Sequence, residues 1–195
     1  MLARREPVTL RSLVAGTGVS TIAVYTYFDG MPGLWRALRQ EGFRRLALHV
    51  GSVERSRDPV RDLAALGVAY AENALANPDL YRVMFDAAFE ALSSTSSDQE
   101  VPDAASATFG HLTVAAERAM TAGRFAPGGD PIEVALRYWA SGHGLVSLTV
   151  TGALTLDDLR RHAPAVASAV FVSAGDSPER ARRSVRSAWN ALSMP

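Results

Sequence analysis

The spacing of apolar residues constrains the fold of this 195-residue chain more than any other feature, because it is helical almost throughout. The residues between the helical segments support the same interpretation. Asp58-Pro59 and Ser177-Pro178 each place a helix-capping side chain before a proline that suits the first helical turn, and Asn77-Pro78 ends one helix and begins the next. Few segments show the alternation typical of strands. The sequence therefore predicts an all-α protein.

The predicted elements divide the chain into two parts. An N-terminal segment with its connecting helix covers residues 1–53, and a helical bundle domain covers residues 54–195. A polar, serine-rich stretch, 93–102, is expected to form a loop. Helices are expected at residues 9–17, 21–28, 32–53, 59–76, 78–92, 104–122, 131–150, 157–172 and 177–192. In the third of these, the residues expected to face inward are Leu34, Leu38, Phe43, Leu46 and Val50, and those expected to face outward are Arg36, Arg39, Arg44 and Arg45.

Missing sequence features exclude several classes of function. The chain has no cysteine, which excludes disulfides, thiolate-bound metals and thiol nucleophiles. No segment resembles a membrane span or a signal peptide, so we expect a cytoplasmic protein without membrane contact. The four histidines lack partners at metal-ligand spacing, and the common nucleotide-binding, zinc-protease and serine-hydrolase motifs are absent. We therefore expect no catalytic residues, no metal and no cofactor.

The net charge of zero hides an asymmetry along the chain. Residues 1–57 contain nine arginines and four acidic residues, a net charge of +5, whereas residues 58–195 carry a net charge of −5. A basic first quarter on an acidic body is typical of a protein that meets a polyanion through that quarter alone. The alternative is a compositional bias without functional meaning.

Residues 9–34 carry the most informative pattern. Two short helices joined by a tight turn at Gly18-Val19-Ser20 are the arrangement of a helix-turn-helix, whose second helix enters the major groove of DNA. Ser20 is expected to cap that second helix, and Val19, Val24 and Phe28 are expected to be buried. Residues expected to contact bases or phosphates are Thr9, Arg11, Thr21, Ile22, Tyr25, Thr26 and Tyr27. The alternative for the aromatic residues is that they pack the interior of this small segment.

In these residues the chain resembles the TetR family of transcriptional regulators. The similarity lies in Val8-Thr9-Leu10-Arg11, Gly18-Val19-Ser20 and Tyr25-Thr26-Tyr27-Phe28, in the family's order and spacing. A second resemblance, to TetR-type C-terminal domains with a recurring Trp, His and Gly, lies in residues 77–85 and in Trp139, His143 and Gly144. The resemblance implies a homodimer that binds a palindromic double-stranded DNA operator, more often as a repressor, and that a small-molecule effector releases.

Three features depart from the family pattern. Only Met1 to Glu6 precede the signature, where the family has a longer helix that covers the next two. A start site assigned too far downstream is the first explanation, and a natural truncation is the second. Met31 stands where the family often has a phosphate-binding lysine, and Gly30 and Gly33 loosen the same region. An alternative function follows: a helical small-molecule-binding dimer that has lost DNA binding.

A ligand pocket lined by apolar side chains with a few polar groups is expected in the C-terminal domain. Its candidate residues are Tyr70, Asn73, Tyr81, Met84, Phe85, Phe89, Phe109, His111, Trp139 and His143. The alternative for the aromatic residues and methionine is ordinary core packing, and for His143 a hydrogen bond to a neighbouring helix. Residues 131–150 and 177–192 are the helices expected at the dimer interface, the latter through Val185, Ala188, Trp189 and Leu192.

Overall fold

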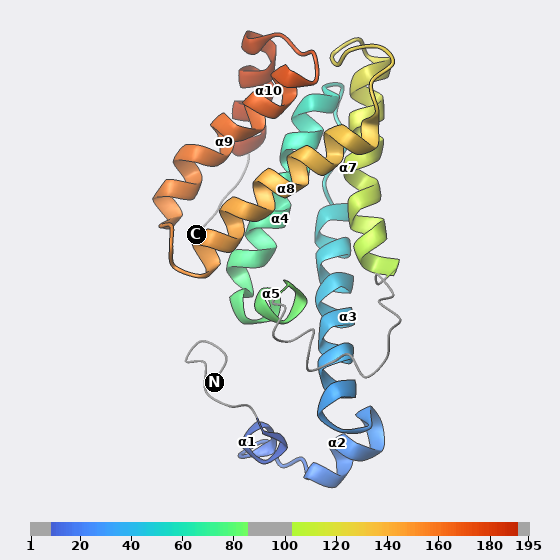
Figure 1. Cartoon of the computed structure of the whole chain (residues 1–195), viewed down its shortest axis with the longest axis vertical. Helices are drawn as coiled ribbons and strands as arrows, with labels where there is room; N and C mark the ends of the chain where they lie inside the picture. The colour runs from blue at the N-terminus through green and yellow to red at the C-terminus, as the bar shows by residue number, and fades with distance from the viewer. Residues whose placement is uncertain (1–8, 86–102, 191–195) are drawn as a thin grey trace.

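The computed structural model describes residues 9–85 and 103–190, and in these ranges every regular element is an α-helix (Figure 1). The prediction of an all-α protein is confirmed. The helices are α1 (Leu10–Val14), α2 (Thr21–Phe28), α3 (Gly30–Gly51), α4 (Pro59–Ala76), α5 (Pro78–Phe85), α7 (Asp103–Thr121), α8 (Pro131–Val150), α9 (Leu156–Ser173) and α10 (Pro178–Asn190). No helix in the described ranges is long and apolar enough to cross a membrane.

Capping side chains fix where several helices begin. Ser20 accepts a hydrogen bond from the backbone N–H of Ala23 at the start of α2, and Asp58 accepts two at the start of α4. Asp130 accepts one from Ile132 and is followed by a proline in the first turn of α8. These side chains satisfy backbone donors that the first helical turn leaves free. The bounds predicted for α2 and α8 therefore coincide with those of the structure.

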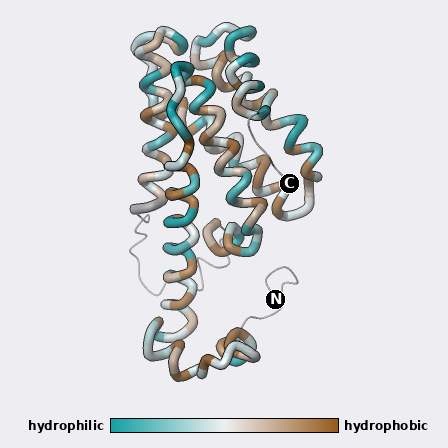
Figure 2. The backbone as a smooth tube through the Cα atoms, turned by 180° about the vertical axis from the view of Figure 1, so that it is seen from behind, coloured by the Kyte–Doolittle hydropathy of each residue, from teal (hydrophilic) through white to brown (hydrophobic). Residues whose placement is uncertain are grey.

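A single long helix, α3, joins a small N-terminal head to the helical body. The head consists of α1 and α2, which lie at one end of the molecule, and α3 extends from them along the side of the body (Figure 1). Seen from behind, α1 and α2 both contain hydrophobic stretches although they lie apart from the body (Figure 2). The α3 helix is thus the covalent and structural link between head and body.

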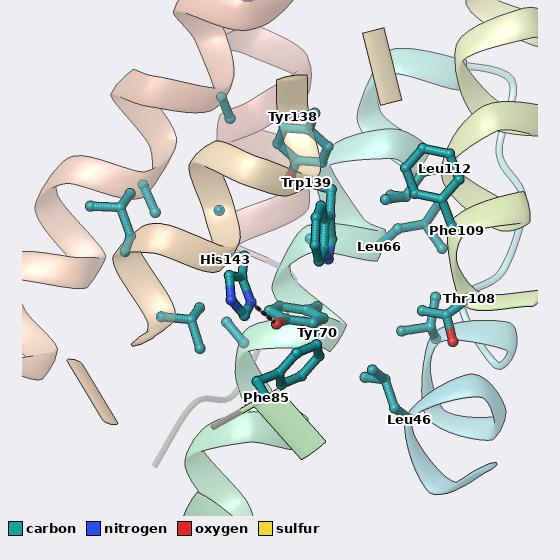
Figure 3. Close-up of a pocket in the computed structure, with 18 of the residues that line it drawn as sticks. Leu46, Leu66, Tyr70, Phe85, Thr108, Phe109, Leu112, Tyr138, Trp139 and His143 are labelled. Carbon is teal, nitrogen blue, oxygen red and sulfur yellow. Dashed lines mark hydrogen bonds between the residues drawn. The ribbon is translucent and has the colours of Figure 1, made fainter. Parts of the chain in front are cut away.

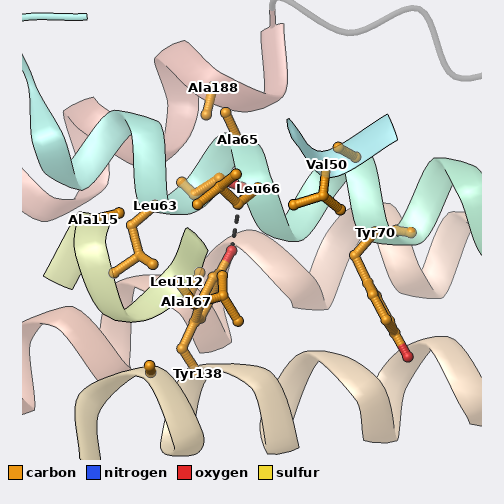
Figure 4. Packing of buried hydrophobic residues seen from close by; sticks show 14 of the residues in the cluster. Val50, Leu63, Ala65, Leu66, Tyr70, Leu112, Ala115, Tyr138, Ala167 and Ala188 are labelled. Atoms are coloured by element: carbon orange, nitrogen blue, oxygen red, sulfur yellow. Dashed lines mark hydrogen bonds between the residues drawn. The ribbon is translucent and has the colours of Figure 1, made fainter. Parts of the chain in front are cut away.

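Helix α4 forms the centre of the body, and it packs against α3, α5, α7, α8 and α10. Most of its residues are buried, as expected of a helix that is apolar around most of its circumference. Leu63 and Leu66 lie in the core beside Leu112 of α7 and Ala167 of α9 (Figure 4). Tyr138 of α8 reaches across and donates a hydrogen bond of 3.2 Å to the Ala64 carbonyl oxygen.

A buried ionic cluster joins three connections of the body. The Arg124 guanidinium donates to both carboxylate oxygens of Asp176, at 3.0 and 2.6 Å, and to Asp58 at 2.6 Å. Ser184 of α10 accepts a hydrogen bond from Arg124 and donates one to Asp58. The carboxylate of Asp176 raises the pKa of Arg124. The cluster therefore ties the start of α4 to α10 and to the connections after α7 and α9.

Two predictions about burial in the head are wrong. Val19 is 50% exposed and Phe28 is 37% exposed, whereas Val24 is buried as expected. The preceding helix, α1, is only five residues long and contains no buried residue, so it provides little cover. Apolar spacing showed which face of α2 is hydrophobic, but it did not show whether anything packs on that face.

Two predictions about the body differ from the structure. In the α10 stripe expected at the dimer interface, Val185 and Ala188 are 1% exposed, because α10 packs on α4 and α9, so they are not free for a partner. Trp189 of the same stripe is half-buried, and Leu192 lies outside the described residues. Arg39 was expected to face outward, yet it is half-buried with its guanidinium over the ring of Phe43, 6.0 Å from the centroid.

Candidate functional site

Helix α2 presents a row of large side chains to solvent. Ile22 is 74% exposed, Tyr25 61% and Tyr27 80%, and Thr26 is exposed beside them. Thr21, in the first turn, is half-buried. Large apolar side chains on an exposed helix are typical of a binding surface rather than of a solvated face.

The preceding helix contributes two further predicted DNA contacts. Thr9 is exposed and caps α1: its hydroxyl accepts a hydrogen bond from the Ser12 N–H, and the Ser12 hydroxyl accepts one from the Thr9 N–H. Arg11, two residues further on, is also exposed. Thr9 therefore has a structural role in addition to any contact with a phosphate.

A close approach fixes the angle between α2 and α3. Asp29 and Gly30, which connect the two helices, both have positive φ angles, of 57° and 85°. A Cβ at Gly33 would lie 1.5 Å from the carbonyl oxygen of Phe28. Glycine is therefore required at residue 33, because α2 ends directly against the first turn of α3. Whatever moves the start of α3 must also move α2.

A cavity of about 490 Å³ lies inside the body, a volume typical of small-molecule sites. Its walls come from α3, α4, α5, α7, α8, α9 and α10. Most of the lining is apolar, and Arg39 is the single residue with a permanent charge among the described residues that form it. Figure 3 shows how Leu46, Leu66, Phe109 and Leu112 surround this space opposite Tyr70. The cavity suits a largely apolar ligand.

A cluster of aromatic and polar groups forms one wall of the cavity (Figure 3). His143 Nδ1 lies 2.7 Å from the hydroxyl of Tyr70 and 2.9 Å from that of Tyr81, and the two hydroxyls are 3.2 Å apart. Trp139 stacks on the His143 ring with centroids 5.2 Å apart, and Phe85 meets it edge-on at 4.7 Å. Side chains from α4, α5 and α8 thus all contact the imidazole of His143.

Burial keeps these polar groups neutral. It lowers the pKa of His143 below its ordinary value of 6.5, because the charged imidazolium loses hydration inside the protein. Burial also raises the pKa of Tyr81 to about 12 and raises that of Tyr70. At neutral pH the wall therefore consists of a neutral imidazole and two phenols that keep their protons.

Comparison with known protein families identifies the chain. The family model described as "Tetracyclin repressor-like, C-terminal domain" matches residues 63–171, more than half of the sequence. The chain belongs to the TetR family. The matched residues include most of α4, all of α5, α7 and α8, and most of α9, and hence most of the cavity wall.

The fold of this TetR-family chain also has a counterpart among solved structures. One described as "Structure of a protein with unknown function from Rhodococcus sp. RHA1" superposes with a TM-score of 0.62. The two sequences are 25% identical, and the match covers 96% of this chain and 86% of the other. A search of curated proteins found no match.

The structure brings together only some of the residues that the sequence predicted for the pocket. Those that line the cavity are Tyr70, Phe85, Phe109, Trp139 and His143. Tyr81 does not line it directly but holds His143 through its hydroxyl. Phe89 lies outside the described residues.

Three other predicted pocket residues lie elsewhere. Met84 is buried against α3, where a Cβ at Gly42 would lie 2.6 Å from its Cγ. His111 packs beside Gly51 at the end of α3, and half-buried Asn73 lies in α4 away from the cavity lining. Apolar or aromatic character did not distinguish these positions from cavity-lining ones.

Sequence reasoning missed other cavity residues, notably Arg39 and Tyr138. A signal for Arg39 was present, because it precedes Phe43, Leu46 and Val50 at helical spacing and so belongs to the same face of α3. Charged residues are rarely buried among apolar ones, so a basic residue on an otherwise apolar helix face indicates a candidate binding site. Tyr138 had no comparable signal, since one tyrosine in an apolar helix is typical of a core.

Proposed function

We propose that this TetR-family protein is a ligand-responsive transcriptional regulator that binds a palindromic DNA operator as a dimer and releases it when a small molecule binds. Repression is the proposed direction of control. The role is regulatory rather than catalytic, since the sequence carries none of the common catalytic motifs. Residues 1–53 are proposed to read DNA, and residues 54–195 to bind the effector and the second copy.

The observation that carries this proposal is the double role of α3. Its first turn holds α2 through the close approach of Gly33 to Phe28, and further along it contributes Arg39, Phe43 and Leu46 to the cavity wall. A ligand that displaces these side chains also displaces α3, and α2 moves with the first turn of α3. Two sites are coupled when both contact one element, here a helix, that adopts different positions in the ligand-bound and ligand-free protein.

Support for DNA binding comes from the exposed face of α2. Ile22, Tyr25 and Tyr27 project from a capped helix of eight residues, a size that fits the major groove. Arg11 and Arg36 are exposed on the flanking helices and add positive charge to the same end of the molecule. Charge of this sign supplies the affinity for phosphates that positions a reading helix.

Support for a dimer comes from α8. Ile132 and Leu136, one turn apart, are 55% and 49% exposed, and exposed Ala140 follows one turn further along the same side. Such a row on one helix is typical of an interface between two identical subunits. Two heads related by a twofold axis would read the two halves of a palindrome.

A direct test is a fluorescence-anisotropy titration with duplex DNA from either side of the protein's own coding sequence. The proposal requires salt-dependent, sequence-selective binding that the double variant Ile22→Ala/Tyr27→Ala loses. One observation favours a second candidate, a ligand-binding dimer without DNA binding: Val19, in the turn before α2, and Phe28, the last residue of α2, are exposed. Equal binding to operator-region and scrambled DNA would favour that second candidate.

A further inference from the structure

The plane and position of the His143 ring are fixed by its neighbours. Trp139 lies nearly parallel to it, at an interplanar angle of 24°, and Phe85 meets it at 61°. The hydroxyls of Tyr70 and Tyr81 hold Nδ1 from two directions. The ring cannot rotate without breaking these contacts, so its two nitrogens have different and fixed surroundings.

The distances around Nδ1 indicate where the imidazole proton lies. Burial leaves both phenols protonated, so two O–H hydrogens are available to the triangle formed by Nδ1 and the two hydroxyls. A phenol O–H is a strong donor and a bare imidazole nitrogen a strong acceptor. If Tyr70 donates to Tyr81 over 3.2 Å and Tyr81 donates to Nδ1 over 2.9 Å, every hydrogen has an acceptor. A proton on Nδ1 would instead leave one hydroxyl hydrogen without an acceptor inside the triangle.

The proton of the neutral ring is therefore on Nε2, which becomes a donor. Nε2 has no hydrogen-bond partner among the described residues and is not among the polar atoms that protein encloses. His143 lines the cavity, and Figure 3 shows cavity-lining side chains on both sides of its ring. A fixed N–H without an acceptor among the described residues, in an apolar space, is a place for an acceptor on a ligand.

We propose that the His143 Nε2–H is the hydrogen bond donor that orients the effector, and that the effector is a mainly apolar molecule bearing a neutral carbonyl-type acceptor. This inference rests on the proposed ligand-responsive function. A pure hydrocarbon would leave the N–H unsatisfied. A carboxylate beside His143 would meet a neutral donor, and loss of its hydration opposes that. Because the charged residue Arg39 also lines the cavity, the test includes an anionic compound.

The test compares three naphthalenes of matched shape: 2-acetylnaphthalene, which has the carbonyl, 2-ethylnaphthalene, which lacks it, and 2-naphthoate, which is anionic. Binding to the full chain is measured by isothermal titration calorimetry at neutral pH. We expect the ketone to bind about tenfold more tightly than the ethyl compound, the ratio that one hydrogen bond of typical strength supplies. The naphthoate is expected to bind more weakly than the ketone.

Two variants locate the effect. His143→Phe keeps an aromatic ring between Trp139 and Phe85 but removes the donor, so the ketone-to-ethyl ratio should fall to about one. His111→Phe is the matched control, because His111 lies outside the cavity lining, and it should keep the wild-type ratio. Nitrogen-15 NMR of labelled histidine in the wild-type protein reads the tautomer directly and does not depend on the folding of a variant.

The possible failures are distinguishable. Equal affinities for ketone and ethyl compound, or an NMR signal showing the proton on Nδ1, would overturn the donor assignment and leave the cavity as a ligand site. Tighter binding of the naphthoate would overturn the neutral class of ligand. Binding of none of the three would overturn this inference together with the small-molecule part of the proposed function.

Discussion

The hydroxyl of Tyr138 occupies the space that a side chain at Gly67 would need. A Cβ at residue 67 would lie 2.1 Å from Tyr138 Oη. The same hydroxyl donates a hydrogen bond to the Ala64 carbonyl oxygen. Helices α4 and α8 therefore approach each other with a phenol inserted between them, directly beside the cavity. The glycine is required by this contact rather than by its own backbone conformation.

Substitution Gly67→Ala should destabilise the protein by about 1–3 kcal/mol, because the added methyl group displaces the Tyr138 hydroxyl and breaks its hydrogen bond to the Ala64 carbonyl oxygen. Urea unfolding measures the change. Gly110→Ala is the matched control: it lies within α7, its Cβ would meet nothing within 4 Å, and alanine should stabilise the helix by up to about 1 kcal/mol. Adding Tyr138→Phe to Gly67→Ala should recover part of the loss. Equal effects at residues 67 and 110 would contradict this account.

Removal of one charge from the buried ionic cluster should be strongly destabilising. Asp176→Asn leaves the enclosed Arg124 with half of its bidentate partner, and a loss of about 3 kcal/mol in the free energy of unfolding is expected. Glu133→Gln breaks an exposed pair with Arg137 and should change the free energy by less than about 1 kcal/mol. A comparably small effect of both substitutions would show that the cluster is not a structural tie.

Protonation of His143 should oppose folding. Burial lowers its pKa in the folded state, so between that value and 6.5 the unfolded chain binds more protons than the folded one. Stability should therefore fall as the pH decreases below about 6.5. Thermal unfolding of wild type and His143→Asn between pH 7.5 and 5 checks the sign, and the variant should lose less stability over this interval. A steeper pH dependence in the variant would refute the assignment.

Tyr27→Ala should separate DNA binding from folding. The side chain is 80% exposed, so its removal should change the free energy of unfolding by no more than about 0.5 kcal/mol. Operator affinity should fall at least about tenfold if the ring contacts bases or phosphates. Arg180→Ala, on the exposed face of α10, is the control that should alter neither property. Unchanged operator affinity in Tyr27→Ala would remove this residue from the interface.

Charge on the exposed row of α8 should prevent dimer formation. Ile132→Glu/Ala140→Glu buries two carboxylates in the proposed interface, and light scattering should detect monomers at concentrations where a wild-type dimer is expected. Arg182→Glu, on an exposed position of α10, should leave the mass unchanged. A dimer that survives the α8 substitutions must be held by another surface.

The sequence predicted the helices well because their ends are chemically marked. Ser20 and the Pro131 start signal placed α2 and α8 at their observed bounds, since caps and prolines act within one helical turn. Burial of Val19 and Phe28 was not predictable in the same way, because it depends on what packs over α2. Local rules define a helix and its apolar face, whereas tertiary packing decides what covers that face.

The cavity was predicted only in part for a related reason. Tyr70, Trp139 and His143 were identified through family resemblance and apolar context, and they converge in the structure. Met84 and His111 had similar context but pack against α3 outside the cavity lining. Which of two buried positions borders empty space depends on the relative placement of several helices, and spacing along one helix does not contain that information.

The unbroken course of α3 sets a rule for exchanging the head, which we propose reads DNA, between proteins of this architecture. Each residue inserted or deleted between Gly33 and Arg39 would turn the head by about 100° and shift it by about 1.5 Å relative to the body. In a symmetric pair the two heads would turn in concert, so one added residue would misalign both with their half-sites. Chimeras must therefore be joined without any change in the length of α3.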